Sequence, residues 1–316
     1  MKILGLTCGR PLGNSEILTI EALMAAEEMG VEVELIRMHD LDVKPCKGCI
    51  SCIKSYFIPG AKPGTCVIKD DVEYFVNKVY EADGVLLAGP LYTGMPPGNL
   101  KCLSDRLGPA VDPGFMKFAK DQGKEVDERA FNPRIGGCIA CGGAVEAPEQ
   151  LGIPILQESF FAGMMITVVD TFVAANISDA GAVLLKDDDI ARARKLGQNM
   201  AKALGTPIDK VEFLGDDPGT CPVCHHKVLL VGNENPVICP TCGIKGELSI
   251  DENGKFHVEF DSEDIRTSRR TSIETRYQHL IDIGEWGDNF MSAQDEIKKR
   301  LEKYKKFDKY AKLPEK

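Results

Sequence analysis

Cysteine is the residue type in this chain with the clearest capacity for chemistry. Eight of the twelve cysteines fall into two groups of four, with short and regular spacing inside each group. The first group is Cys46, Cys49, Cys52 and Cys66, and the second is Cys221, Cys224, Cys239 and Cys242. In a reducing compartment, clustered cysteines indicate metal or redox chemistry more often than disulfides. The sequence therefore predicts two separate thiolate centres.

In the first group, three cysteines recur at every third position of the segment PCKGCISC. Their sulfurs can face a common centre only if the backbone curls, and Gly48 eases such a curl. Thirteen residues with two Pro-Gly pairs then separate Cys52 from Cys66, and these turns can return the fourth thiol to the other three. The spacing predicts a [4Fe-4S] cluster. The alternatives are reduced structural cysteines or a different metal.

The second group consists of two CPxC pairs that are separated by fourteen residues. This pattern is typical of a zinc ribbon, in which four thiolates surround one ion as a tetrahedron. Zinc would be structural, whereas iron in the same four thiolates would add a one-electron centre, and the residues do not separate the two metals. Because four sulfurs suffice, we expect His225 and His226 to be surface neighbours rather than ligands.

The segment from Thr7 to Glu16 joins a predicted strand to the start of a predicted helix. Such a junction offers unpaired N–H groups and the positive end of the helix dipole, which suit a phosphate. Arg10 adds a positive charge, and Thr7, Asn14 and Ser15 add side-chain donors. The segment matches neither GxGxxG nor the P-loop. The plain alternative is an ordinary turn that ends in a serine cap.

The first two thirds of the chain alternate between apolar strands and amphipathic helices, which predicts an α/β fold with a doubly wound parallel sheet. The expected strands are residues 2–7, 31–38, 84–90, 134–143 and 166–175. The expected helices are residues 15–30, 70–83, 97–108 and 187–205. Ligands of such sheets bind at the carboxyl ends of the strands, and the unusual loops at 7–16, 39–66, 90–99 and 140–146 all follow strands. We expect residues 109–133 to be a surface insertion.

The composition changes after about Leu204. We expect a main domain at 1–205 that includes the cysteine-rich loop 45–66, a linker at 206–219, a zinc ribbon with a small β-hairpin module at 220–260, and a helical tail at 261–316. In the tail, Trp286 is expected to anchor the packing, and the basic run 298–306 to be a solvated helix face.

Charge and hydropathy exclude several function classes. The net charge of −10 argues against broad binding to nucleic acid or to anionic membranes. The ribbon segment 220–260 has three Lys and five Asp or Glu, so it lacks the basic patch of a nucleic-acid module. No apolar stretch approaches the ~20 residues of a membrane span, and no signal-peptide core is evident near Met1. We therefore expect a cytoplasmic protein with no nucleic-acid or membrane partner.

Three motifs together resemble a known family. The segments GLTCGRPLGNSEIL and GPLYTGMPPGNLKCLSDR, and the cysteine run that ends in CVIKDD, look like the flavodoxin-like NADPH-dependent FMN reductase superfamily, and within it the iron–sulfur flavoproteins. The resemblance covers about residues 1–205. It departs from the family at Cys8-Gly9, where Ser-Pro is usual, at Thr93, where a second aromatic is frequent, and in the long gap before Cys66.

This resemblance implies a set of site residues. The FMN phosphate would be held by Thr7, Arg10, Gly13, Asn14, Ser15 and Glu16. The isoalloxazine ring would be bordered by Pro90, Leu91, Tyr92, Thr93, Gly94, Met95, Cys141, Gly142 and Gly143. Lys101, Asp105 and Arg106 also match a family pattern, and we interpret them as structural or interfacial. No side chain is expected to act as a catalytic acid or base, because the chemistry would belong to the flavin.

The expected function is that of an FMN-dependent oxidoreductase of the iron–sulfur flavoprotein type. It would pass electrons between a ferredoxin-like one-electron carrier and a two-electron acceptor through [4Fe-4S] and FMN. The first alternative is an NAD(P)H-dependent FMN reductase without a cluster that acts on quinone, nitro or other organic substrates. The second is a flavin-free interaction protein. Because a second subunit typically completes the flavin edge in the family, the resemblance implies a homodimer or homotetramer.

Overall fold

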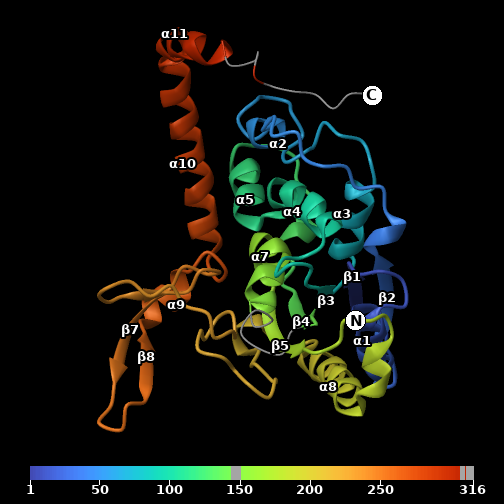
Figure 1. The fold of residues 1–316 in the computed structure, drawn as a ribbon. Helices are drawn as coiled ribbons and strands as arrows, with labels where there is room; N and C mark the ends of the chain where they lie inside the picture. Colours follow the sequence, from blue (N-terminus) through green and yellow to red (C-terminus); the bar gives the residue numbers. More distant parts are fainter. Residues whose placement is uncertain (144–150, 307–309, 311–316) are drawn as a thin grey trace.

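A five-stranded parallel sheet forms the centre of the computed structural model, which describes residues 1–143, 151–306 and 310. The strands run in the order β2-β1-β3-β4-β5 (Figure 1). Their bounds are β1 Lys2–Thr7, β2 Glu32–Arg37, β3 Gly84–Pro90, β4 Ile135–Cys141 and β5 Thr167–Ala174. The predicted flavodoxin-like α/β fold is therefore confirmed. The chain changes direction across the sheet between β1 and β3, which is where such folds bind ligands.

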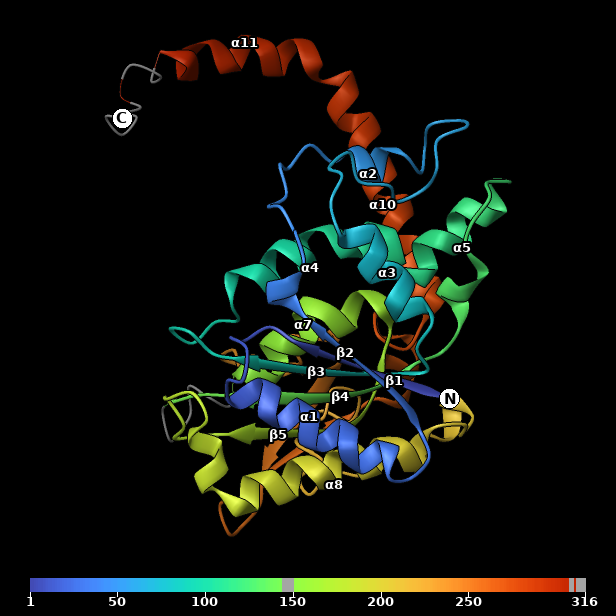
Figure 2. The same cartoon turned by 90° about the vertical axis from the view of Figure 1, so that its right-hand side faces the viewer.

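Helices cover both faces of the sheet, so the central strands are buried along almost their whole length. Figure 2 shows α1 and α8 on one face and α3, α4 and α7 on the other. The bounds are α1 Asn14–Glu27, α3 Val72–Tyr80, α4 Gly98–Val111, α7 Gly152–Met164 and α8 Asp187–Ala203. α1 and α8 approach so closely that a Cβ on Gly197 would overlap the backbone of Ala22. The sequence analysis assigned no element to the segment that forms α7.

Residues 109–133 are not the predicted surface insertion, and this expectation is wrong. α4 continues to Val111, and α5 follows at Pro113–Asp121, with a short 3-10 helix η2 at Glu128–Phe131. Asp112 caps α5 by accepting hydrogen bonds from the N–H groups of Gly114 and Phe115, at 2.9 and 3.2 Å. Several α5 side chains are buried, so this segment is part of the core.

The short elements lie mainly in the connections between strands and helices. They are η1 Met38–Asp40, α2 Ser51–Lys54, η3 Ala182–Leu185 and η4 Ile208–Lys210. η4 is followed by a stretch that runs along the edge strand of the sheet, because the Leu214 N–H donates to the Val169 carbonyl at 2.7 Å. The linker is thus attached to β5 rather than free.

The C-terminal third forms a small antiparallel sheet and a helical tail. The predicted hairpin is confirmed as β7 Lys245–Ile250 and β8 Phe256–Phe260, joined by β6 Val237–Ile238. The tail consists of α9 Ser262–Thr267, α10 Ile273–Ser292 and α11 Gln294–Lys305. None of the described helices is both long and apolar enough to span a bilayer.

The tail is attached to the body through α5 and not through Trp286. Leu280 of α10 is fully buried, and the rings of Tyr277 and Phe118 lie 5.6 Å apart. Arg276 forms a buried ion pair with Asp112, with its Nε 2.7 Å from the carboxylate. Trp286 is instead 79% exposed, so its predicted role as a packing anchor is wrong.

Asp112 is predicted to be the residue on which the attachment of the tail depends. Asp112→Ala removes the α5 cap and leaves the buried Arg276 charge without its partner, which costs about 3–5 kcal/mol for a buried pair. Urea unfolding, followed by circular dichroism, should show the lower midpoint. Asp121→Ala is the matched control, because its pair with Lys117 is about 40% exposed on both sides and such pairs contribute less than about 1 kcal/mol. Equal midpoints for the two variants would contradict the prediction.

Candidate functional site

The loops that were predicted to border a flavin meet at the carboxyl edge of β1, β3 and β4. The Cys8 N–H donates to the Ala88 carbonyl at 3.2 Å, and the Leu91 N–H donates to the Cys141 carbonyl at 2.8 Å. Asn99 of α4 donates to the Cys8 carbonyl at 3.2 Å. The phosphate loop, the loop after β3 and the end of β4 are therefore neighbours. Part of the predicted loop 140–146 lies outside the described residues.

The phosphate loop has a conformation that suits an anion. The N–H groups of Asn14, Ser15 and Glu16 begin α1 and have no preceding turn of helix to accept them. The Thr7 and Ser15 hydroxyls lie 3.5 Å apart at the base of the loop. A Cβ on Gly9 would overlap Ser15 Oγ and press on Pro90, so the backbone of the loop packs closely at this position. This concave backbone fits a phosphate group.

Two of the predicted phosphate ligands use their side chains elsewhere. The Asn14 amide donates to the carbonyls of Ile177 and Asp179 at 3.0 and 2.8 Å, and its oxygen accepts from the Val183 N–H. The Glu16 carboxylate is buried and accepts from Arg37 Nε at 2.9 Å. Its second oxygen, Oε2, has no hydrogen-bond partner among the described residues. Both side chains brace the start of α1, which leaves the backbone and Arg10 to face an anion.

After β3 the chain makes a tight turn that projects apolar groups. Tyr92 and Met95 exchange backbone hydrogen bonds at 2.8 and 3.2 Å. Thr93 and Gly94 occupy the turn with φ of +55° and +74°, values that favour glycine at the second position. The Tyr92 and Met95 side chains are more than half exposed. The turn therefore presents an aromatic and a thioether at the sheet edge, where a flat ring can lie against them.

The cysteine loop is held closed by one buried arginine from α4. Arg106 donates to the Lys44 carbonyl at 3.0 Å, just before the first cysteine, and to the Ile68 carbonyl at 3.3 Å, just after the last one. It also forms a buried ion pair with Asp70, with Nη2 2.8 Å from Oδ1. One guanidinium thus joins both ends of the loop. This contact explains the family pattern at Arg106, whose role in the loop the sequence reasoning missed.

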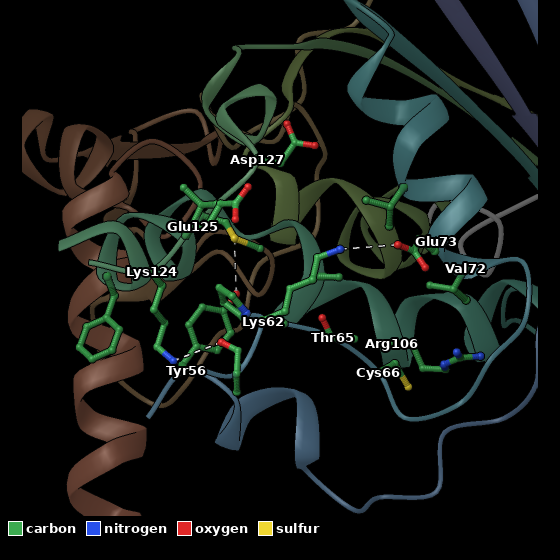
Figure 3. Close-up of a pocket in the computed structure, with 18 of the residues that line it drawn as sticks. Tyr56, Lys62, Thr65, Cys66, Val72, Glu73, Arg106, Lys124, Glu125 and Asp127 are labelled. Atoms are coloured by element: carbon green, nitrogen blue, oxygen red, sulfur yellow. Dashed lines mark hydrogen bonds and ion pairs between the residues drawn. The ribbon is translucent and has the colours of Figure 1, made fainter. Parts of the chain in front are cut away.

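Arg106 also lies beside one of the predicted cluster ligands. Figure 3 shows the Cys66 side chain next to the guanidinium. The Asp70 carboxylate, and to a smaller extent Cys66, raise the pKa of Arg106, so the group is charged. Its Nε–H is buried and has no hydrogen-bond partner in the part of the chain that the structure describes. A buried guanidinium that still has one N–H free to donate beside a thiol suits that thiol in its anionic, metal-bound form.

The loop itself curls as its spacing predicted. Gly48 has a φ of +66° and Ile50 a φ of +52°, and the Gly48 N–H points at Cys46 Sγ at 3.4 Å. Cys46 and Cys49 are exposed, while Cys52 and Cys66 are partly buried. The long segment between the last two encloses a cavity of about 1350 Å³ against α3, α4 and α5 (Figure 3). The extra residues before Cys66 therefore form one wall of this cavity.

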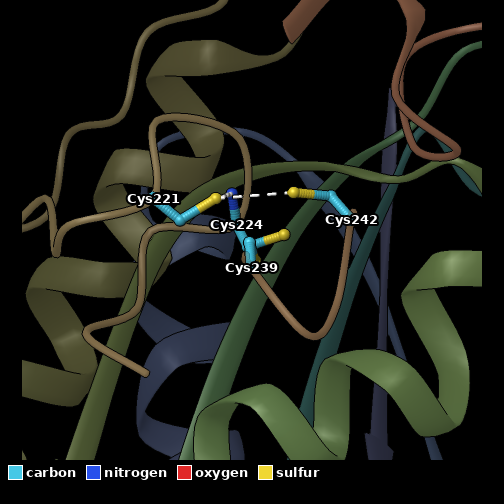
Figure 4. Close-up of side chains that lie close together, drawn as sticks. All are labelled: Cys221, Cys224, Cys239 and Cys242. Carbon is cyan, nitrogen blue, oxygen red and sulfur yellow. Dashed lines mark hydrogen bonds between the residues drawn. The ribbon is translucent and has the colours of Figure 1, made fainter. Parts of the chain in front are cut away.

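The four cysteines of the second group form a compact centre. Their Sγ atoms lie within 4.8 Å of one another, and all four side chains are buried (Figure 4). Among the described residues, no other set of three or more His, Cys, Asp or Glu ligand atoms is gathered so closely. The sulfurs of the first group are not gathered so closely. A cubane cluster does not require this, because it arranges its thiolates around an inorganic core rather than around one atom. The second centre can hold a single metal ion.

The thiolate centre is fixed to α7 through buried polar groups. Arg270 lies 3.6 Å from Cys224 Sγ and donates to the Gln157 side chain at 2.8 Å and to the Ile166 carbonyl. Gln157 in turn donates to the Cys224 carbonyl at 2.9 Å. His226 is buried and not a surface neighbour, which corrects the prediction, and its Nε2 lies 3.0 Å from Thr241 Oγ1 and 3.7 Å from Cys239 Sγ.

The remaining thiols have no redox arrangement. None of the twelve cysteines forms a disulfide. Burial raises the pKa of Cys8 to about 12, so this thiol stays protonated in the phosphate loop. Cys138 and Cys141 belong to the cores on opposite faces of the sheet. Their CxxC spacing therefore does not make a dithiol pair.

Comparisons with known proteins agree with this architecture. The family described as NADPH-dependent FMN reductase matches residues 1–178. A flavone synthase of Aspergillus candidus is 29% identical over 292 residues, which cover 89% of this chain and 88% of that protein. An iron–sulfur flavoprotein of Methanocaldococcus jannaschii is 32% identical over 211 residues, which cover 65% of this chain and 97% of that protein.

The overall shape is also shared with a solved structure. A protein described as a flavone reductase superposes with a TM-score of 0.78 at 28% identity, and the match covers 100% of both chains. The family match spans more than half of the chain, and it coincides with the loops at the carboxyl edge of the sheet. The chain belongs to the NADPH-dependent FMN reductase family and is a flavin-dependent oxidoreductase.

Proposed function

We propose that the chain is an FMN-dependent oxidoreductase whose cysteine loop holds a [4Fe-4S] cluster. The cluster would exchange single electrons with a ferredoxin-like carrier, and the flavin would serve a two-electron organic acceptor. The observation that carries this proposal is the Arg106 clamp, which joins both ends of the CxxCxxC loop and places a buried positive charge at Cys66. Relatives named iron–sulfur flavoprotein support it. Family membership leaves no place for the flavin-free alternative.

In this proposal the first turn of α1 holds the FMN phosphate. The N–H groups of residues 14–16, the Thr7 and Ser15 hydroxyls and the exposed Arg10 are the donors, and Gly9 and Gly13 let the backbone approach. The ring is bordered by residues 90–95 and 141–143. Asn14 and Glu16 act by bracing the loop, which changes the role expected for their side chains. When bound, FMN supplies both one-electron and two-electron chemistry.

The thiolates Cys46, Cys49, Cys52 and Cys66 would hold the iron–sulfur cluster, and the partly exposed loop would let a protein carrier approach it. Arg106 would offset part of the negative charge of the thiolates. The second centre, Cys221, Cys224, Cys239 and Cys242, would hold structural zinc, since four buried thiolates at this separation are a typical zinc set. Arg270 would offset part of its charge.

A second candidate function has a specific observation in its favour. The relatives named flavone synthase and flavone reductase match nearly the whole chain, whereas the match to the archaeal iron–sulfur flavoprotein covers 65% of it. The exposed Tyr92 and Met95 also suit a flat aromatic substrate. The chain would then take electrons directly from NAD(P)H and act on a conjugated, flavone-like compound, without a cluster.

Cofactor content separates the two candidates. Protein purified without oxygen should contain about one FMN, four iron, four acid-labile sulfide and one zinc per chain. Reduced ferredoxin should then reduce the flavin faster than NAD(P)H does, as followed by loss of flavin absorbance. FMN and zinc without iron or sulfide, together with rapid reduction by NAD(P)H, would support the second candidate and contradict the first.

The two metal centres should be separable by substitution. Cys49→Ala should remove iron and sulfide and leave zinc in place, while Cys242→Ala should remove zinc and leave iron in place. Each variant is the control for the other, because both remove one cysteine. Elemental analysis with sulfide determination measures the outcome. Loss of both metals in either variant would mean that the centres are not independent.

Arg106 should control the cluster specifically. Arg106→Gln loses the charge and the two-ended clamp, so we expect less than half of the wild-type iron per chain and, in the cluster that remains, a more negative reduction potential. Arg106→Lys keeps the charge but loses the planar guanidinium that donates to both ends of the loop. The reduction potential of the cluster should therefore stay closer to the wild-type value than the iron content does. Redox titration followed by EPR measures both quantities.

The matched control is Arg134→Gln. Arg134 is also buried and also donates to backbone carbonyls, those of Val79, Tyr80, Arg129 and Asn132, but it does not touch the cysteine loop. It should keep the wild-type iron content and potential. Wild-type iron content and a wild-type reduction potential in Arg106→Gln would contradict the role proposed for Arg106 at the cluster.

A further inference from the structure

The last two helices form a projecting arm, which we define as residues 285–306. The N-terminal part of α10 is fixed to α5 by the Arg276–Asp112 ion pair and by the buried Leu280. Beyond Gly284, which lies against Phe57, residues 285–293 are exposed without a break. Figures 1 and 2 show α11 turning away from the end of α10, clear of the sheet and its helices. The arm is therefore held firmly at its base and uncovered beyond it.

The surface of the arm is unusually apolar for a solvated helix. Its large exposed side chains are Trp286 (79%), Phe290 (56%), Met291 (66%), Leu301 (47%) and Tyr304 (57%). Trp286 and Phe290 are four residues apart, and Leu301 and Tyr304 are three apart, so each pair lies on one helix face. Large apolar side chains that are exposed together on one helix face are typical of an interaction site.

The second helix of the arm, α11, is opposite in charge to the rest of the chain, whereas the whole arm, which includes Glu285 and Asp288, has a net charge of +1. Residues 294–306 contain six Lys or Arg and three Asp or Glu, a net charge of +3, while the whole chain carries −10. The remainder therefore carries −13. An amphipathic, basic helix that projects from an acidic body is complementary to the body of another copy of the same chain.

We propose that the arm is an interface between two copies of this chain, with each arm packed on the body of the other copy. The arrangement is reciprocal, as expected for a two-fold dimer. A bare aromatic side chain presents on the order of 150–250 Å². At the exposed fractions given above, five large side chains leave roughly 600 Å² per arm to be covered.

This area decides between a second copy and a transient carrier. Two arms and the two surfaces that they cover would bury roughly 2,400 Å², more than the ~1,600 Å² of a standard interface. A carrier on a single arm would bury roughly 1,200 Å² in total, which is already the upper limit of electron-transfer encounters. The basic helix α11 alone would suit an acidic carrier, but such a brief contact would leave Trp286 and Phe290 uncovered most of the time. The apolar surface therefore favours a stable copy-to-copy contact.

The arm contains its own probe, because Trp286 is the single tryptophan of the chain. Full-length protein is diluted from micromolar to nanomolar concentration while mass is followed by light scattering and Trp286 by emission and acrylamide quenching. We expect a blue-shifted, quench-protected emission wherever the mass is that of two or more chains, and a red shift when the chains separate. A single-chain mass at micromolar concentration would overturn the proposal. So would an assembly in which Trp286 is quenched as freely as tryptophan in solution.

A double variant tests the contact without removing the probe. Phe290→Ser with Leu301→Ser should weaken association at least tenfold and expose Trp286 at micromolar concentration. Ile250→Ser with Phe256→Ser is the matched control, since these side chains are 61% and 65% exposed on the β7–β8 hairpin, away from the arm. The control should associate as the wild type does. Equal association of both double variants, with Trp286 protected in each, would overturn the proposal.

Discussion

Buried guanidinium groups attach every addition to the α/β body of this protein. Arg106 joins the two ends of the cysteine loop to α4, Arg270 joins the thiolate ribbon to α7 and to the residue that precedes β5, and Arg276 joins the tail to the cap of α5. Each of these arginines is at least largely buried, and each donates to carbonyls or to a buried acid. A buried charge without its partner is costly, so each contact defines one arrangement of the segment that it holds.

The parallel sheet was predictable because its signals are local. Continuous apolar runs and helix starts follow from neighbouring residues, and the order of strands then follows from a few topological rules. The thiolate centre of Cys221, Cys224, Cys239 and Cys242 was also predictable, since cysteine spacing is read directly from the chain. The meeting of the unusual loops at one edge of the sheet was predictable for a different reason. Loops that follow parallel strands must lie at the same edge.

The errors arose where contacts between distant residues decide the structure. Asp112-Pro113 is a helix-start signal. It predicts a helix at the position of α5 and therefore argues against a surface insertion there. No local signal reports that Asn14 is used by residues 177–183, or that His226 is buried beside Thr241. Trp286 was expected to anchor the packing of the tail, yet the first half of α10 already makes the contacts with α5.

The α/β body and the segments added to it contribute differently to function. The phosphate loop and the edge of the sheet supply a place for a flavin, and a flavin can serve many electron donors and acceptors. In the proposed function, the cysteine loop would decide which donor reaches the flavin, and the ribbon and the arm would decide which surfaces remain open. Each of these parts is joined to the body by one buried arginine together with a few other contacts, and this small set fixes their positions relative to the flavin edge. In that proposal, the specificity of this chain would follow from how the additions are attached, more than from the fold that carries them.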